Sequence, residues 1–304
     1  MKRFLSILAL LLVSAAYGQS SEIVQQGNVT ITDDPNTATT EGNLTVDGKA
    51  RAKGSLEVGP YSYTKATGVS SVAIGNGAVA SSENAFALGS WTAAEGPASV
   101  AMGNGAVAGY SHSVALGFNA KSSSDSAYAM GSYAEAIASN SYAFGPSAKA
   151  VSYNSIAFGE NAVSQGGNGT AIGSKAKALF YGAIAVGANS EAKASFGAVL
   201  GSFATSDTFG QTTIGRYNSP IVSKVNSAEA WFDDDPLFIV GNGKSAETLS
   251  NALVVYKNGD AEVSGKLTVK KAGGGISMGE FGPQNANEAK AAETSAADQI
   301  EKAG

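Results

Sequence analysis

The stretch SVAIGNGAVA, residues 71–80, returns along the chain in near-copies. SVAMGNGAVA occupies residues 99–108, and SVALGFNAKS follows at residues 113–122. Each copy is short, carries at most one charge and consists mainly of glycine, alanine and larger apolar residues. A sequence that repeats at a fixed spacing predicts a fold of stacked equivalent units, so the spacing of these copies decides the architecture.

The glycine in the middle of each copy defines that spacing. The residue before it is large and apolar from Ile74 to Ile214, and the residue two before it is alanine from Ala73 to Ala185. The glycines follow one another at steps of fourteen residues without an insertion, at Gly75, Gly89, Gly103, Gly117, Gly131, Gly145, Gly159, Gly173, Gly187, Gly201 and Gly215. We take these eleven glycines as the structural residues of the repeat.

A period of fourteen also equals two heptads, so a coiled coil is the competing interpretation. Glycine in every repeat argues against helices, because it costs about 1 kcal/mol relative to alanine in a helix interior. Within a copy the side chains alternate, with Val72 and Ile74 on one face and Ala73 on the other. Each unit is therefore expected to hold two short strands, near 71–74 and 77–80, separated by corners.

One corner position is occupied repeatedly by asparagine, a residue that tolerates a left-handed backbone. The asparagines that share this position are Asn84, Asn140, Asn154 and Asn168. Stacked in register, such units form parallel strand ladders around a thin interior lined by alanine. The sequence leaves open which of the two bulky columns faces that interior. Because a thin coil cannot bury both, we expect neighbouring copies of the chain to cover the rest in a closed oligomer.

Composition excludes several classes of protein. The 304 residues carry a net charge of −5 and no basic cluster, which disfavours nucleic acid as a partner. Cysteine is absent and His112 is the single histidine, so disulfides, thiol catalysis and most zinc or Ser-His sites are excluded. The carboxylates of the repeat region are too scattered for a polysaccharide-cleaving pair. We therefore predict no enzyme, no catalytic residue, no cofactor and no metal site.

Three polar features of the sequence are interpreted as structural. His112 falls in the asparagine corner column, and GGNG at 166–169 lacks the Lys-Ser/Thr of a phosphate loop. The run Asp233–Asp235 before Pro236 lacks calcium-loop spacing and is interpreted as a polar turn. Aromatic residues outside the glycine columns are either ligand contacts or packing between chains at the corners, and we favour the packing: Trp91, Tyr110, Phe118, Tyr133, Tyr153, Phe180, Tyr181, Phe196 and Phe203.

The flanks divide the chain into further segments. Residues 1–18 have the basic start, apolar core and small-residue cleavage site of a signal peptide, which predicts an exported chain without another membrane-spanning run. Residues 19–68 are expected to form an N-terminal β cap and residues 69–220 the repeat region. Residues 221–283, with a tight-turn signal at Asn258-Gly259, are expected to form a C-terminal β module, followed by a polar Ala/Glu/Lys-rich tail at 284–304.

The repeats SVAIGNGAVASSENAFALGS (71–90) and NSIAFGENAVSQGGNGTAIGSKAKA (154–178) resemble the head repeats of trimeric autotransporter adhesins of the YadA type. The resemblance implies a left-handed parallel β-roll, a homotrimer and display on a bacterial surface. It also implies attachment to matrix proteins, cells, glycans or other bacteria. After Val269 the sequence lacks the alternating strands of that family's membrane anchor. Residues 236–260 are instead similar to a module of bacterial and phage fibres. A structural or tail-fibre component without a ligand of its own is therefore the alternative function.

Overall fold

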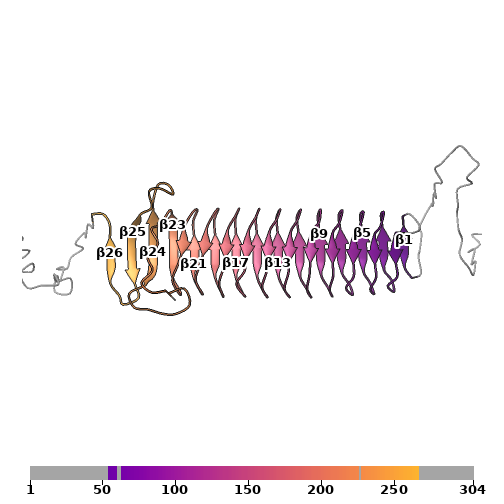
Figure 1. Cartoon of the computed structure of the whole chain (residues 1–304), viewed down its shortest axis with the longest axis horizontal. Helices are drawn as coiled ribbons and strands as arrows, with labels where there is room; N and C mark the ends of the chain where they lie inside the picture. Colours follow the sequence, from indigo (N-terminus) through magenta and orange to yellow (C-terminus); the bar gives the residue numbers. More distant parts are fainter. Residues whose placement is uncertain (1–53, 60–62, 226, 267–304) are drawn as a thin grey trace, which may run out of the picture. The chain divides into compact units, whose positions relative to one another are not determined.

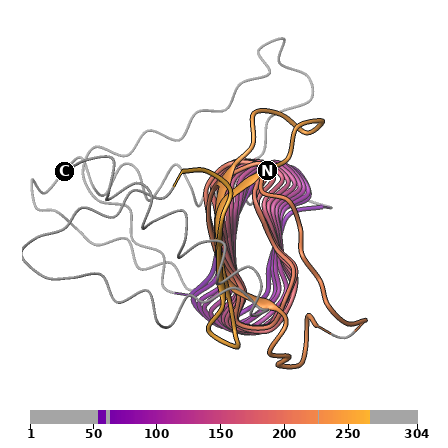
Figure 2. The same cartoon turned by 90° about the vertical axis from the view of Figure 1, so that its left-hand side faces the viewer.

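The computed structural model describes residues 54–59, 63–225 and 227–266, and these residues form an all-β fold without a helix. The strands stack one behind another along a single direction (Figure 1). Seen along the stack, they lie on the two long sides of a flattened coil (Figure 2). One side is a sheet of fifteen strands and the other a sheet of eleven.

Each coil contributes a strand of three residues to the larger sheet and a strand of two residues to the smaller one. In spatial order the larger sheet comprises β1 (Leu56–Val58), β3 (Val72–Ile74), β5 (Phe86–Leu88), β7 (Val100–Met102), β9 (Val114–Leu116), β11 (Tyr128–Met130), β13 (Tyr142–Phe144), β15 (Ile156–Phe158), β17 (Thr170–Ile172), β19 (Ile184–Val186), β21 (Ala198–Leu200), β23 (Thr212–Arg216), β24 (Pro236–Asn242), β25 (Asn251–Tyr256) and β26 (Ala261–Val263). The smaller sheet comprises β2 (Lys65–Ala66), β4 (Val79–Ala80), β6 (Ala93–Ala94), β8 (Val107–Ala108), β10 (Lys121–Ser122), β12 (Glu135–Ala136), β14 (Lys149–Ala150), β16 (Val163–Ser164), β18 (Lys177–Ala178), β20 (Glu191–Ala192) and β22 (Thr205–Ser206).

The register of the strands repeats the period of the sequence. In β13 and β15, Ala143 lies beside Ala157 and Phe144 beside Phe158, and the pairing is parallel. The same offset of fourteen residues relates neighbouring strands from β3 to β23, so equivalent residues of successive coils form ladders. The prediction of a parallel β-solenoid with fourteen-residue coils is confirmed.

The interior of the coil is lined by small residues, mostly alanine with serine and threonine at some positions. From β3 to β21 the central residue of each three-residue strand is fully buried, as Ala73 and Ala143 illustrate, and so is the second residue of most two-residue strands, as in Ala80. The bulky residues on either side of each central alanine point away from the interior and are half-buried or exposed. This answers the question that the sequence left open, because neither bulky column faces the interior.

The eleven repeat glycines lie where the larger sheet turns into a corner. Their φ angles run from +97° to +155°, a region that residues with a Cβ rarely adopt. Close stacking adds a second constraint. A Cβ on Gly145 would lie 2.7 Å from the carbonyl carbon and oxygen of Gly159 in the next coil. Glycine therefore fits this position both because of its backbone conformation and because of the distance between coils.

Both ends of the repeat region extend the larger sheet. At one end β1 pairs in parallel with β3. At the other end β24 pairs in parallel with β23, and β25 and β26 then add antiparallel neighbours. Asn258 and Gly259 lie between β25 and β26, as the turn signal predicts, and Gly259 has a φ of +94°. The predicted signal peptide (1–18) and polar tail (284–304) lie outside the described residues.

Candidate functional site

The outward surface of the larger sheet is apolar over eleven successive coils. We call this surface the apolar face and define it by the outward residues of β3 to β23, which are Val72, Ile74, Phe86, Leu88, Val100, Met102, Val114, Leu116, Tyr128, Met130, Tyr142, Phe144, Ile156, Phe158, Ile172, Ile184, Val186, Leu200 and Ile214. Thr170, Ala198 and Thr212 complete the two columns. Since the strands are in register, the side chains form two parallel apolar ladders.

The middle of the apolar face carries a run of aromatic rings. The rings of Tyr128 and Tyr142 stack at 5.1 Å with an interplanar angle of 4°. Tyr142 lies 6.4 Å from Phe144, and Phe144 lies 6.1 Å from Phe158. Phe158 is still 55% exposed, although its neighbours along the sheet are also apolar. Stacking within one chain therefore leaves much of this surface in contact with water.

The outward surface of the smaller sheet is more polar. Its outward strand residues include Val79, Val107 and Val163, but charged side chains follow from β10 onward. We call these the charged ladder, defined by Lys121, Glu135, Lys149, Lys177 and Glu191 of the strands together with Lys193 and Asp207 just after β20 and β22. Ion pairs join successive coils at 3.0 Å between Lys149 Nζ and Glu135 Oε2 and at 2.6 Å between Lys177 Nζ and Glu191 Oε1. The ladder is therefore suited to contact with water.

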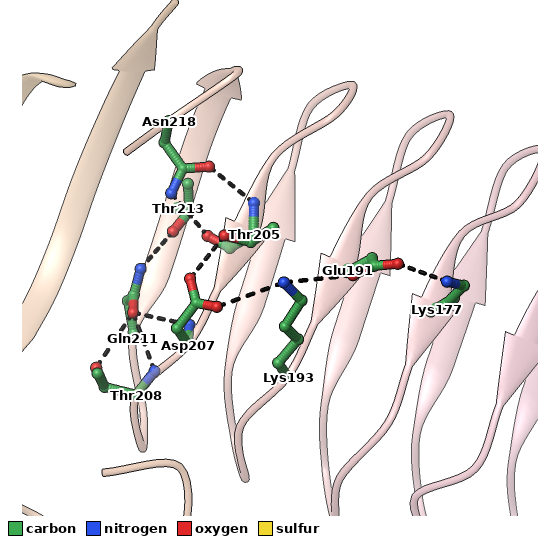
Figure 3. A network of polar contacts seen from close by, with 9 residues as sticks. All are labelled: Lys177, Glu191, Lys193, Thr205, Asp207, Thr208, Gln211, Thr213 and Asn218. Carbon is green, nitrogen blue, oxygen red and sulfur yellow. Dashed lines mark hydrogen bonds and ion pairs between the residues drawn. The ribbon is translucent and has the colours of Figure 1, made fainter. Parts of the chain in front are cut away.

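Glu191 is the centre of the ladder shown in Figure 3. Its second carboxylate oxygen lies 3.4 Å from Lys193 Nζ, which in turn lies 3.6 Å from Asp207 Oδ1. Partial burial by itself would raise the pKa of Glu191. The hydrogen bond from Lys177 and the charges of Lys177 and Lys193 outweigh that effect, so the pKa is lowered. Glu191 is thereby held in its charged form.

The ladder ends in a polar network that fills the last coil. Gln211 is fully buried; its Oε1 accepts hydrogen bonds from the backbone of Asp207 and from Thr208, and its Nε2 donates to Thr213 Oγ1 at 2.8 Å. Asn218 bonds both the N–H and the carbonyl of Thr205 (Figure 3). Thr213 and Asn218 occupy the two alanine columns in the last coil, and the network explains why polar residues fit there.

The family model described as YadA head domain repeat (2 copies) matches residues 66–90, 94–120, 111–134, 136–162 and 164–190. Within residues 66–190 the chain is therefore similar to YadA head repeats. Among solved structures, the chain is similar to the crystal structure of the collagen-binding domain of Yersinia adhesin YadA. The two are 18% identical with a TM-score of 0.24, and the match covers 75% of this chain and 92% of that chain. No curated protein matches the chain. In the part of the chain that the structure describes, no helix is long and apolar enough to cross a membrane.

The corners of the coils carry many of the other aromatic residues. Trp91 adopts a left-handed backbone, with a φ of 55°, and its ring covers Gly77 of the preceding coil. Phe196 covers Gly182 in the same way, and the ring of Tyr153 lies against Gly167. Further edge-to-face or stacked pairs are Phe118–Tyr133, Tyr181–Phe196 and Phe203–Tyr217. These rings are about half exposed, and their contacts join coils of one chain.

The remaining residues that the sequence singled out do not converge on one site. His112 is an exposed corner residue with a φ of 56°, and its Nδ1 lies 2.9 Å from Ser111 Oγ. Asn168 of the GGNG stretch has the same left-handed conformation. Within the described ranges, no group of three His, Cys, Asp or Glu side chains is placed to hold a metal ion.

Sequence reasoning missed one residue of the acidic run. Asp233 and Asp234 are polar turn residues, but Asp235 is fully buried and forms an ion pair with Lys257. Both β24 and β25 separate Asp235 from Lys257 along the chain. The sequence around Lys257 indicates only the turn at Asn258-Gly259, so nothing in it predicts a buried lysine. The only sequence signal for this pair is the Pro236 that follows Asp235, because it fixes where β24 starts.

Proposed function

We propose that the chain is the head of a homotrimeric, surface-displayed adhesin that attaches its cell to host matrix, to other cells or to other bacteria. The single observation that supports this proposal best is the apolar face. The similarity to YadA head repeats within residues 66–190 supports the adhesin class independently of that face.

The apolar face supports a trimer on physical grounds. Two bulky columns over eleven coils form one contiguous apolar surface that is partly exposed in the single chain, and contiguous apolar surfaces of this kind mark sites of association. The interior of the coil is filled mostly by alanine and serine, so these bulky side chains have no place inside their own chain. If three chains turn their apolar faces toward one axis, all three are covered and the assembly is closed.

The same arrangement supports a role in attachment. With the apolar faces inside, the charged ladders and the aromatic corners of three chains point outward. Each contact to a ligand is then repeated along the coils and around the axis. Weak single contacts gain strength through multivalency when several engage the same surface. Collagen, the ligand for which the Yersinia YadA domain is named, is the first ligand to test.

Two measurements on the purified chain from residue 19 to residue 304 test the proposal. Light scattering coupled to size exclusion should give three times the chain mass, and a folded monomer would refute the trimer. Binding is then measured on immobilised collagen, fibronectin, glycan arrays and cells. A folded trimer that binds none of these surfaces would refute the adhesin and favour a structural fibre.

Export is tested separately in the producing cell. A signal peptide at residues 1–18 predicts that the exported chain begins near Gln19 and that it is accessible to protease added outside intact cells. Amino-terminal sequencing of the surface-released fragment checks both points. A chain that keeps Met1 and stays protected in intact cells would refute surface display.

A further inference from the structure

A lysine and an aspartate face each other in the interior of the C-terminal β module. Lys257 follows directly after β25, and Asp235 directly precedes β24. The backbone N–H of Lys257 donates to the carbonyl of Asp235 at 3.0 Å, so the pairing of the two strands fixes the two residues opposite each other. Both side chains are fully buried, and Lys257 Nζ lies 3.7 Å from Asp235 Oδ2.

The two oxygens of Asp235 have different surroundings. Oδ1 accepts three hydrogen bonds: 3.0 Å from the N–H of Ser223, 2.6 Å from Ser223 Oγ and 3.0 Å from Ser227 Oγ. Oδ2 has no hydrogen-bond donor among the described residues and faces Lys257 Nζ. Oδ1 therefore has the hydrogen bonds that a carbonyl oxygen accepts. Oδ2 has none, so no hydrogen bond would be lost if Oδ2 departed from Cγ.

Lys257 Nζ is equally unusual. Its distance to Oδ2 is too long for a charge-assisted hydrogen bond, which measures about 2.7–2.9 Å. Among the described residues it has no hydrogen-bond acceptor, and it lies over the ring of Trp231, 4.8 Å from the ring centroid. A buried ammonium with three unused donors is costly. Burial lowers the pKa of Lys257, although the charge of Asp235 opposes that shift.

We propose that Lys257 and Asp235 condense to an intramolecular isopeptide bond that locks β24 to β25. A proton passes from the ammonium of Lys257 to Asp235 Oδ2, which leaves an amine and a carboxylic acid. Nζ then attacks Cγ of Asp235, and the negative charge that develops on Oδ1 is stabilised by the donors of Ser223 and Ser227. The Cγ–Oδ2 bond breaks, a second proton moves from Nζ to Oδ2, and one water leaves. No oxidant, reductant or cofactor is required.

The product fits the site better than the ion pair does. An amide has no net charge, so the cost of burying two ions disappears. Its carbonyl oxygen keeps the three hydrogen bonds that Oδ1 already accepts. The bond would join the start of β24 to the end of β25 and thereby close the antiparallel end of the larger sheet covalently.

The experiment is intact mass spectrometry of the purified chain from residue 19 to residue 304, followed by peptide mapping. We expect a mass lower than that of the sequence by one water, and a tryptic peptide in which the segment containing Asp235 is joined to the segment containing Lys257. Trypsin should no longer cleave after Lys257. The mapping separates this bond from a succinimide at Asp47-Gly48, which would remove the same mass elsewhere in the chain.

Two variants serve as controls. Lys257→Arg keeps a positive charge beside Asp235 but replaces the amine nucleophile, and Asp235→Ala removes the carboxyl. Both should show the full mass and normal fragment patterns. A folded wild-type chain of full mass that trypsin cleaves after Lys257 would overturn the proposal and leave the two residues as a buried ion pair. That result would not affect the proposed trimer or its adhesion, which rest on the repeat region.

Discussion

Gly145 and Ala143 lie two residues apart in one coil, but different constraints determine them. Gly145 must turn the chain with a φ of +126° against the backbone of the next coil. Ala143 has an ordinary strand conformation and is limited by the thin interior, in which it is fully buried. At the scale of the residue, backbone conformation thus determines the glycine column, and side-chain volume determines the alanine column.

Replacing Gly145 by alanine should destabilise the fold severely. A left-handed φ costs about 1–3 kcal/mol for a residue with a Cβ, and the new Cβ must also displace Gly159. We expect a loss of at least about 2 kcal/mol, measured from the midpoint of urea unfolding at fixed protein concentration. Gly210→Ala is the matched control, because Gly210 has a φ of +68° but a Cβ added there would meet no atom within 4 Å. Equal losses for both variants would contradict the role of close stacking.

Enlarging Ala143 to leucine should also destabilise the coil, because the interior has no room for three more carbon atoms. Overpacking of this kind costs about 1–3 kcal/mol or more. The comparison is Ala93→Leu, which makes the same change on the outward, half-buried side of the smaller sheet. A thermal melt should show a clear drop for Ala143→Leu and little change for Ala93→Leu. An unchanged melting temperature for Ala143→Leu would show that the interior is not confined.

At the scale of the element, a strand of two or three residues has no stability of its own. β14 and β16 persist because each is one rung of a ladder whose neighbours are held in the same register. The charged ladder adds side-chain contacts to that backbone register, since Lys149 reaches back to Glu135 and Lys177 forward to Glu191. Exposed ion pairs of this kind contribute modestly, and their contribution depends on pH.

Glu191→Gln should lower stability at neutral pH by about 0.5 kcal/mol, the range of partly exposed ion pairs. The pKa of Glu191 is lowered in the folded chain, so its contribution is present above the unfolded-state pKa of about 4.3. The contribution is lost as the pH falls through the folded-state pKa. Urea midpoints measured across pH should therefore converge for wild type and variant in acid. Glu83→Gln, at an exposed position without an ion pair among the described residues, is the control and should shift the midpoint little at any pH.

The sequence predicts the repeat better than it predicts the ends, and the reason is periodicity. Three columns in phase are enough to predict the coil length, the short strands and the glycine corners, because each signal is repeated in every coil. The buried pair of Asp235 and Lys257 occurs once and depends on how β24 and β25 pair. The orientation of the bulky columns is only partly predictable from the sequence. Alternation places Val72 and Ile74 on the same face of the strand, but it does not indicate whether that face points into the coil or out of it.

At the scale of the whole molecule, the larger sheet presents the apolar face and the smaller sheet presents the more polar surface that carries the charged ladder. The apolar face would favour association and the charged ladder would favour water, so one chain carries both the contact surface and the exposed surface of an assembly. The corner aromatics lie between these two surfaces and are already packed against glycines of neighbouring coils. A charged substitution on the larger sheet should therefore disrupt assembly, whereas the same substitution on the smaller sheet should leave assembly intact.

Phe158→Asp should break the proposed trimer without unfolding the coil. Phe158 lies on the apolar face with a 55% exposed side chain, so the charge is tolerated in a monomer but not in a covered interface. Val163→Asp introduces the same acid in the same coil on the outward side of the smaller sheet. Light scattering should give the monomer mass for Phe158→Asp and the trimer mass for Val163→Asp, with unchanged β-sheet circular dichroism in both. The same mass for both variants would rule out the apolar face as the interface.

The constant offset of fourteen residues between neighbouring strands also determines how the length of this protein can evolve. Unequal crossing-over between two copies of the repeat in the gene adds or removes whole coils. Each added or removed coil changes the length of the stack by about 4.8 Å, and the remaining coils still stack on equivalent neighbours. A deletion of any other size shifts glycines into strands and leaves alanines at the corners. The length of the stack can therefore vary in small, equal steps without loss of the fold.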